Sequence, residues 1–216
     1  LVDGPFGVRA AVLDCATAAA GARAAPAARA GVDPAAIRVV TWNIQKEDND
    51  GWQDDLARFA AGSDVLLLQE VVLQDALTSI LRGAGLAWVM ASSFAYQSAD
   101  IGVLTATRVS PVASCTQRIA EPLLAIPKSA VITWLPVPGS RTTLAVANVH
   151  AINFSLSLAA FEAQFDALSA VLAAHDGPLL VGGDLNTWSQ ARRAAVRRFA
   201  DRLGLAEVAY AEDGRA

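Results

Sequence analysis

The sequence predicts an α/β fold, a β-rich domain in which two packed sheets carry helices on their outer faces. Short apolar runs rich in Val, Leu and Ile alternate with segments in which apolar residues recur at helical spacing. Glycine, proline and short polar stretches separate these segments. With 216 residues, of which 54% are hydrophobic and 18% charged, the chain has the length and composition of a folded domain with one sizeable core.

The expected strands and helices follow one another in order. A β-branched run at 37–43 is bounded by a polar, turn-like stretch. Trp52, Leu56 and Phe59 then recur at the spacing of a helix face. The run at 65–68 is apolar throughout, which predicts a strand covered on both faces. The predicted strands span residues 37–43, 65–68, 86–90, 101–105, 129–135, 142–150 and 178–183. The predicted helices span residues 52–59, 73–81, 158–172 and 189–203.

Residues 1–36 differ from the rest of the chain. They are rich in Ala with scattered Arg, Gly and Pro, and they lack the ordered parts of a signal peptide. We therefore expect a mobile leader or linker at 1–36 and one domain at 37–216. The chain begins without Met and stops in a polar stretch, an ending that either a folded domain or a fragment can have. No apolar run approaches the roughly 20 residues that a membrane span needs.

Composition and charge argue against several kinds of function. The 17 basic and 21 acidic residues give a net charge of −4, which argues against a broad basic surface for tight DNA binding. The chain has 2 histidines, too few for a multi-histidine zinc site. Cys15 and Cys115 lie far apart and outside any C-x-x-C pair, so we expect free thiols, either buried or in a reducing compartment such as the cytoplasm; the alternative is a disulfide between them.

Polar side chains follow the apolar runs of several predicted strands. These residues are Asn43, Glu70, His150 and Asp184. A buried strand that ends in an ionisable group places that group at the rim of a sheet, where ligand sites in α/β folds commonly lie. Together the four positions predict one shared rim.

Each of these residues also has an ordinary structural interpretation. Glu70, at the edge of a core, needs a partner, which is either a hard cation such as Mg²⁺ or a nearby Arg. Asn43 either adds an amide oxygen to a metal, orients Glu70, or forms a turn. His150 is either a satisfied core residue or, beside Glu70 and Asp184, a group that stabilises or protonates a leaving oxygen.

The segment 182–186, Gly-Gly-Asp-Leu-Asn, is the sharpest motif. Its glycines allow a ligand to approach the backbone, and Asp184 and Asn186 are spaced to reach one phosphate or water. We expect Asp184 to orient the attacking water and Asn186 to donate to a phosphoryl oxygen. The alternative is a helix cap, although a helix N-terminus itself favours anions. Asn153 and Lys128 are further candidates for phosphate contacts.

The last predicted helix carries several arginines. Because they flank its apolar stripe on both sides rather than share one face, we expect a solvated helix surface instead of a basic binding face. These residues are Arg192, Arg193, Arg197, Arg198 and Arg202.

Four short motifs in a fixed order carry a resemblance to a known family. They are Thr41-Trp42-Asn43-Ile44, Leu67-Leu68-Gln69-Glu70, Asn148-Val149-His150 and Gly183-Asp184-Leu185-Asn186. Weak singly and specific together, these motifs resemble those of the endonuclease/exonuclease/phosphatase family over about residues 38–205. The segments 147–156 and 186–189 look most similar to an uncharacterised bacterial branch of that family.

The resemblance implies a four-layer α/β/β/α sandwich, in which two mixed β-sheets pack face to face between helices. It also implies hydrolysis of a phosphate ester by metal-assisted water attack, with Mg²⁺ or Mn²⁺ bound by Glu70 and Asn43 assisting. On this resemblance Asp184 and Asn186 would hold the phosphate and the water, and His150 would act near the leaving group.

This sequence departs from the family pattern after Asn186. Family members carry a further Asp and a C-terminal Ser-Asp-His segment, whereas no histidine follows His175 here. We therefore expect the final strands of the sandwich to be absent and activity to be reduced by roughly 10²–10⁴-fold. The alternative function is a catalytically impaired or non-catalytic domain that binds a ligand or partner on the same scaffold. In either case we expect a monomer whose partner is a phosphate ester, with nucleic acid among the candidates.

Overall fold

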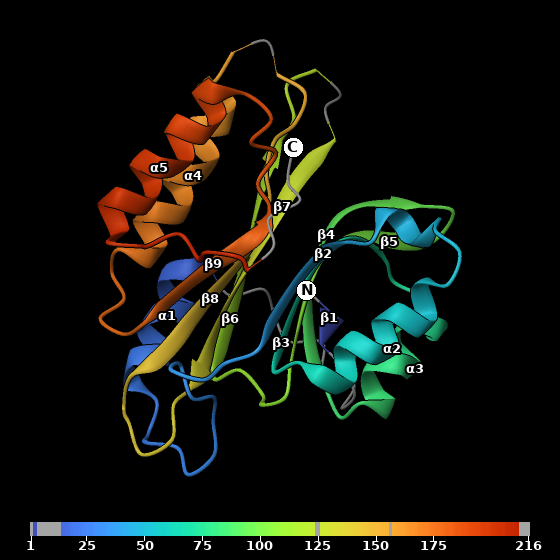
Figure 1. Ribbon diagram of the computed structural model, residues 1–216. Helices are drawn as coiled ribbons and strands as arrows, with labels where there is room; N and C mark the ends of the chain where they lie inside the picture. The colour runs from blue at the N-terminus through green and yellow to red at the C-terminus, as the bar shows by residue number, and fades with distance from the viewer. Residues whose placement is uncertain (1, 4–13, 124–125, 156, 212–216) are drawn as a thin grey trace.

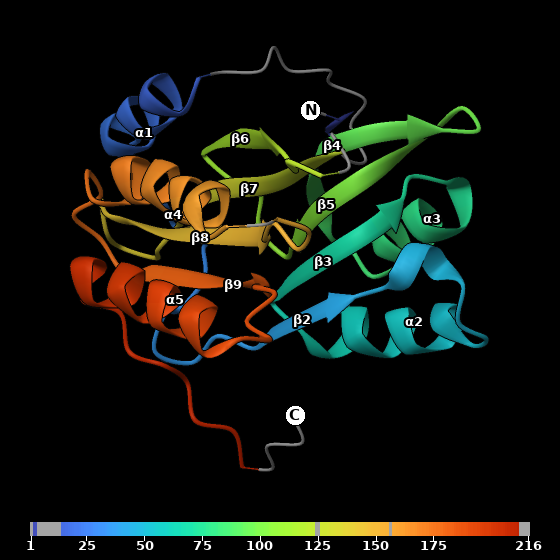
Figure 2. The same ribbon diagram turned by 90° about the horizontal axis from the view of Figure 1, so that it is seen from above.

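Two β-sheets and the helices on their outer faces form four layers (Figures 1 and 2). The computed structural model describes residues 2–3, 14–123, 126–155 and 157–211. Its helices are α1 (Cys15–Ala24), α2 (Trp52–Gly62), α3 (Asp75–Gly83), α4 (Ala159–Leu172) and α5 (Gln190–Leu203), with a 3₁₀ turn, η1, at Gln45–Glu47. Its strands are β1 (Val2–Asp3), β2 (Val39–Asn43), β3 (Val65–Val72), β4 (Ala87–Tyr96), β5 (Ala99–Thr107), β6 (Ala113–Ala120), β7 (Pro127–Pro136), β8 (Thr143–His150) and β9 (Leu179–Asp184).

Both sheets are mixed, and each contains one parallel pair. The first sheet has the order β1-β4-β5-β3-β2 and the second has the order β6-β7-β8-β9. The pairs β2–β3 and β8–β9 are parallel, and the other neighbouring strands are antiparallel. Helices α2 and α3 cover the outer face of the first sheet, while α1, α4 and α5 cover that of the second (Figures 1 and 2). The expected sandwich of two mixed sheets between helices is confirmed.

Strand β3 shows how the sequence pattern produces these layers. Leu66 and Leu68 pack with the apolar residues of α2 and α3, whereas Val65 and Leu67 face the second sheet and pack beside Val146. Successive side chains of a strand point to opposite faces, so an apolar run without alternation serves two cores at once. The prediction that this strand is covered on both faces is therefore confirmed.

The predicted elements from residue 37 onward are all present, with ends that differ by a few residues. From residue 37 onward one strand was not predicted, β6, in which Cys115 is the buried residue. Half of its residues are polar, as suits an edge strand of its sheet in the described part of the chain. A strand that buries a single residue contains no apolar run by which the sequence could reveal it.

The N-terminal region differs from the expected mobile leader. Helix α1 begins after Asp14, whose side chain accepts a hydrogen bond from the backbone N–H of Thr17 at 2.9 Å. Ala18, Ala19 and Ala22 are buried in the core beneath the second sheet. Small side chains allow this close contact, but they produce only a weak amphipathic pattern. Residues 1 and 4–13 of the expected leader lie outside the described residues.

The expectation of two free thiols is wrong. Cys15, at the start of α1, forms a disulfide with Cys115 in β6, and their Cα atoms are 5.1 Å apart. The bond joins positions separated by 100 residues. Sequence spacing alone does not reveal such a pair, because the two positions meet only when α1 packs on the second sheet.

No helix in the described ranges is both long and apolar enough to cross a membrane.

Candidate active site

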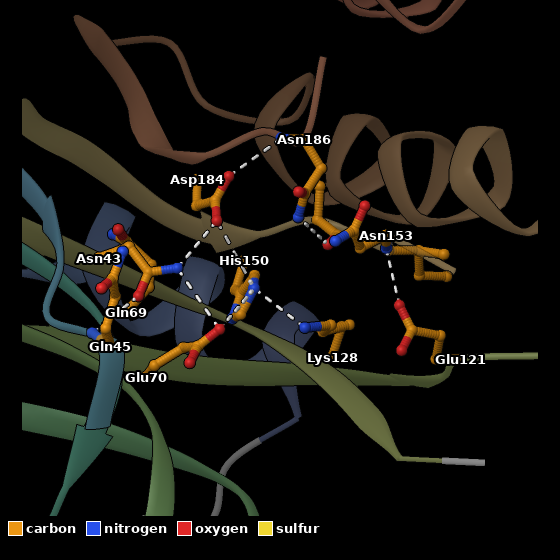
Figure 3. Close-up of polar contacts among 12 residues, drawn as sticks. Asn43, Gln45, Gln69, Glu70, Glu121, Lys128, His150, Asn153, Asp184 and Asn186 are labelled. Atoms are coloured by element: carbon orange, nitrogen blue, oxygen red, sulfur yellow. Dashed lines mark hydrogen bonds and ion pairs between the residues drawn. The ribbon is translucent and has the colours of Figure 1, made fainter. Parts of the chain in front are cut away.

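The predicted rim exists because both parallel strand pairs end at the same edge of the sandwich. In the first sheet Asn43 is paired with Gln69, and in the second His150 is paired with Asp184. The two pairs lie on facing sheets, so their carboxyl ends project polar side chains toward one another (Figure 3). Glu70 follows Gln69 and completes the group, which brings the four predicted rim residues together as expected.

The two carboxylates converge on one histidine nitrogen. His150 Nε2 lies 3.8 Å from Glu70 Oε1 and 3.7 Å from Asp184 Oδ2. Asn43 Nδ2 lies between the same oxygens and donates to Asp184 Oδ2 at 2.9 Å and to Glu70 Oε1 at 3.5 Å. The oxygen of Asn43 accepts the backbone N–H of Gln45 at 3.0 Å. Of the roles considered for Asn43, this geometry supports the orientation of carboxylates.

The backbone at Glu70 is in a conformation that is rare for residues other than glycine. Its φ is 54°, and the pairing of β3 with β5 shifts register between Leu68 and Val71. A bulge of this kind re-aims a side chain at the edge of a sheet, and strained residues of this kind cluster at functional sites. The bulge turns the Glu70 carboxylate toward His150.

Lys46 is the partner of Glu70 in the structure, in place of the Arg considered from the sequence. Its Nζ lies 2.7 Å from Glu70 Oε2. Burial tends to raise the pKa of Glu70, but the Lys46 ammonium and the neighbouring His150 outweigh it and hold that pKa below its ordinary value. Lys46 comes from η1, where three successive residues have positive φ. The position of this lysine, soon after the strand-ending Asn43, is the signal for it in the sequence.

His150 is a neutral imidazole at neutral pH. Burial, followed by the positive charge of Lys128, lowers its pKa to about 4, although Asp184 and Glu70 act in the opposite direction. Lys128 Nζ lies 3.0 Å from His150 Nε2. Because an ammonium can only donate, Nε2 accepts this hydrogen bond and the ring proton lies on Nδ1. Lys128, predicted as a phosphate contact, thus belongs to the same rim.

Asp184 and Asn186 lie at the end of β9, where the backbone closely approaches the neighbouring strand β8. Gly183 has a φ of 130°, and a Cβ placed on it would lie 2.0 Å from the Val149 carbonyl oxygen. Asn186, with φ 49°, donates its backbone N–H to Asp184 Oδ1 at 3.2 Å and its side-chain amide to the Ala151 carbonyl at 2.9 Å. Helix α5 is instead capped by Ser189. The alternative in which Asp184 or Asn186 caps this helix is therefore wrong.

Beneath the rim, a buried polar bridge joins the two sheets. Gln69 Nε2 donates to Asn148 Oδ1 at 2.7 Å, and Asn148 Nδ2 donates to the Leu104 carbonyl at 2.9 Å and to the Leu68 carbonyl at 3.3 Å. Both side chains are at most 1% exposed. The sequence analysis assigned no role to either residue, although both stand in the strand-end motifs. Their bonds fix the spacing of the sheets directly below Glu70 and His150.

Replacing Asn148 by Ala is expected to lower the free energy of unfolding by about 1–3 kcal/mol, because the change removes buried hydrogen bonds that water cannot replace. Urea unfolding followed by tryptophan fluorescence measures this quantity. Asn49→Ala is the matched control, because the Asn49 side chain is exposed and hydrogen-bonds Gln45 at the surface. Equal stability of the two variants would contradict a structural role for the bridge.

Two loops hold the remaining predicted residue, Asn153, beside Asn186 (Figure 3). The buried carboxylate of Glu121 accepts the backbone N–H groups of Asn153 at 2.7 Å and of Phe154 at 2.8 Å. The side-chain oxygen of Asn153 accepts the indole N–H of Trp188 at 2.9 Å. Glu121 and Trp188 were not predicted as site residues. Glu121 follows no apolar strand, and Trp188 stands in the segment 186–189, where no role was assigned to it.

One arginine of α5 contradicts the expected solvated surface. Arg192 is 1% exposed, whereas Arg193, Arg197, Arg198 and Arg202 are exposed as predicted. The spacing contains a signal for this difference, because Arg192 lies three and seven positions before Ala195 and Phe199, on the buried stripe of the helix. Its guanidinium is satisfied by carbonyl groups of the site loops.

The donor set fits a hard divalent cation. Carboxylate oxygens of Glu70 and Asp184 face a common point from two sheets, and oxygen ligands of this kind suit Mg²⁺ and Mn²⁺. Within the described residues, no group of three or more His, Cys, Asp and Glu side chains is arranged to hold a metal ion by itself. Mg²⁺ in phosphoryl-transfer sites is commonly held by one or two carboxylates together with water and substrate phosphate, so this arrangement is sufficient.

Comparisons with known proteins show which family and which relatives the chain is similar to. The profile of the endonuclease/exonuclease/phosphatase family matches residues 40–208. A UPF0294 protein of Vibrio campbellii is 35% identical over 179 residues, which are 83% of this chain and 63% of that protein. A UPF0294 protein of Yersinia enterocolitica is 37% identical over 179 residues, 83% of this chain and 68% of that protein. This chain therefore spans roughly two thirds of the length of these relatives.

The fold is similar to that of the catalytic domain of human nocturnin, solved with a bound sulfate anion. The TM-score is 0.57 at 20% sequence identity, over 76% of this chain and 69% of that one. The predicted family, including its bacterial branch, is thus confirmed by the family profile and by the bacterial relatives.

Proposed function

The chain belongs to the endonuclease/exonuclease/phosphatase family, and on this basis we propose that it hydrolyses a phosphate ester with the help of a bound divalent cation. One observation carries the proposal: Glu70 and Asp184, from two different sheets, converge within 3.8 Å of His150 Nε2. Two carboxylates directed at one point repel each other, and a divalent cation bound between them would remove that repulsion. This geometry therefore supports a cation site at the rim.

Glu70 and Asp184 would hold the cation, and Asn43 would keep both carboxylates in place through its amide N–H groups. A bound Mg²⁺ supplies Lewis-acid stabilisation of the charge that develops on the phosphoryl oxygens. Lys46 neutralises Glu70 when no other cation is near. Since the Lys46 side chain is exposed and joined to Glu70 at the surface, its displacement costs only about 0–1 kcal/mol.

The other residues of the rim would bind and orient the reacting groups. Asp184 is proposed to accept a hydrogen bond from the water whose oxygen attacks phosphorus. Asn186 and Asn153 carry amide N–H groups for the phosphoryl oxygens, and Asn186 uses only one of its two in the bond to Ala151. The Lys128 ammonium, which donates to His150 Nε2, is proposed to give the leaving oxygen its proton, and His150 to hold that ammonium in position.

Hydrolysis of a generic phosphodiester, bis(p-nitrophenyl) phosphate, tests the proposal. We expect turnover that requires Mg²⁺ or Mn²⁺, that stops on addition of a chelator and returns with the metal. His150→Ala is expected to lower kcat by roughly 10²–10⁴-fold. The matched control is His175→Ala, because His175 lies outside the rim and is hydrogen-bonded to the Thr143 carbonyl oxygen. Metal-independent turnover, or equal rates in both histidine variants, would count against the mechanism. The non-catalytic alternative predicts no turnover at all.

We also propose an oxidising compartment in place of the expected cytoplasm. The disulfide between Cys15 and Cys115 supports this proposal, because such bonds persist in oxidising compartments and are rare in the cytosol. Alkylation of thiols in intact cells, followed by mass spectrometry, is expected to leave both cysteines unmodified. Full alkylation of the pair would restore the cytoplasmic assignment.

A further inference from the structure

A buried guanidinium organises the outer side of the candidate active site. Arg192 donates to the carbonyl oxygens of Ile152, of Asn153 at 2.8 Å and of Asn186 at 3.3 Å. It also donates to Ser155 Oγ at 3.2 Å. All four acceptors lie in the loops that follow β8 and β9. One cation therefore locks together the two loops that carry the predicted phosphate contacts.

Trp188 lies on this guanidinium and is fixed at two points. The Arg192 guanidinium carbon is 4.7 Å from the centre of the Trp188 ring, and the indole N–H donates to Asn153 Oδ1 at 2.9 Å. Even so, Trp188 is 65% exposed. Because one ring face and the N–H edge are occupied, the exposed area belongs to the other face and the far edge. The structure therefore presents an open, rigid aromatic face beside the phosphate contacts.

The same contact determines which end of the Asn153 amide faces the substrate. A side-chain amide can offer either its oxygen or its NH₂ group. Trp188 uses the oxygen, and Asn153 Nδ2 has no hydrogen-bond partner within the described part of the chain. Only the NH₂ group suits an anionic phosphate. A phosphate held at Asn153 would therefore lie next to the Trp188 ring.

We propose that the outer face of Trp188 stacks against the base of a small, nucleotide-like substrate whose phosphate is bound at Asn153 and Asn186. This inference rests on the proposed function and specifies its substrate class. Stacking of a base on an aromatic side chain stabilises binding in a sequence-tolerant way. The ring is already fixed, so stacking costs little further side-chain entropy.

The charges around the site favour a short nucleotide over a long nucleic acid or a membrane. A long polyanion requires rows of Lys and Arg, whereas this chain has a net charge of −4 and places Glu70 and Asp184 at the rim. At a bilayer surface, an interfacial tryptophan directs its N–H toward headgroups. The N–H of Trp188 instead points into the protein, to Asn153.

Equilibrium binding of adenosine 5′-monophosphate and ribose 5-phosphate in metal-free buffer tests the inference without any turnover. The two ligands share the sugar and the phosphate and differ by the base. We expect the nucleotide to bind tighter by roughly 5- to 150-fold, the range expected for one stacked base. Isothermal titration calorimetry provides the readout, because it measures binding in the unmodified chain and in its Trp188 variants alike.

Two variants separate stacking from orientation of Asn153. Trp188→Ala is expected to reduce the preference for the nucleotide to nearly 1. Trp188→Phe keeps a ring but loses the N–H, so it is expected to weaken both ligands alike and to retain the preference. Equal binding of the two ligands by the unmodified chain, or an unchanged preference in Trp188→Ala, would overturn the inference. Trp188-dependent sedimentation with phosphatidylcholine vesicles would overturn it as well.

These outcomes are separate from those of the proposed function. A base preference that depends on Trp188, in a chain that hydrolyses no phosphate ester, would support the subsite while the hydrolase proposal fails. Metal-dependent turnover without any base preference would support the hydrolase and reject the subsite.

Discussion

Replacement of Glu70 by Gln is expected to lower kcat for phosphodiester hydrolysis by roughly 10²–10⁴-fold, since a cation-assisted site contributes several kcal/mol to the barrier. Glutamine has the same shape but no charge, so it is a poor ligand for Mg²⁺ and leaves Asp184 as the remaining carboxylate of this pair. The fold should be nearly unaffected. Glu70 is partly exposed and its ion pair with Lys46 lies at the surface, where such pairs contribute about 0–1 kcal/mol.

A direct measurement of metal binding supports the kinetic test. Titration with Mn²⁺, followed by electron paramagnetic resonance, is expected to show at least a tenfold loss of affinity in Glu70→Gln, as expected when a ligand is lost. Glu162→Gln is the matched control, because the Glu162 carboxylate pairs with Arg198 on the helix surface away from the rim. If Glu70→Gln and Glu162→Gln bind Mn²⁺ equally, Glu70 is not a metal ligand and the site assignment fails.

Reduction of the disulfide is expected to lower the free energy of unfolding by about 3–5 kcal/mol. A crosslink between positions 100 residues apart restricts the unfolded chain strongly, and chain-entropy arguments give about 4.7 kcal/mol for a loop of that length. Helix α1 has little else to hold it, because the residues that it buries are the small side chains of Ala18, Ala19 and Ala22. The bond thus compensates for a weak apolar contact.

Urea unfolding with and without a reducing agent measures the effect of the disulfide. The double variant Cys15→Ser/Cys115→Ser should match the reduced protein and should not respond to the reducing agent. The rate of hydrolysis should change by no more than about threefold, since Cys115 lies in β6 and none of the rim contacts involves α1. An unfolding midpoint that does not move on reduction would show that the crosslink adds no stability.

Much of the fold could be predicted from local pattern. The apolar run of β3 and the helical spacing from Trp52 to Phe59 depend only on the period of side chains along an element, so they are visible in the sequence. The same is true of the strand-end positions of Asn43 and Asp184. Helix α1 and strand β6 lacked such a pattern. One buries only alanines, and the other is an edge strand with polar side chains.

The residues of the candidate site could likewise be predicted only where they stand in short motifs. Glu70, His150, Asp184 and Asn186 stand in short motifs, and the parallel pairing of their strands brings them to one edge. Lys46, Glu121 and Arg192 stand outside these motifs, and Trp188 stands in the segment 186–189, which by itself assigns it no role. Their roles depend on loops that fold back over the rim, and a contact between residues 35 or 40 positions apart has no local signature.

By itself the sequence determined which side chains end the apolar strands, because strand period and burial are properties of neighbouring residues. Only the tertiary structure decided how these side chains are used. The packing of two sheets set Glu70 and Asp184 at 3.8 and 3.7 Å from one nitrogen of His150. It also paired Cys15 with Cys115 and buried Arg192 beneath Trp188. Such contacts depend on distances between segments remote in the chain, which the packing of the layers alone determines.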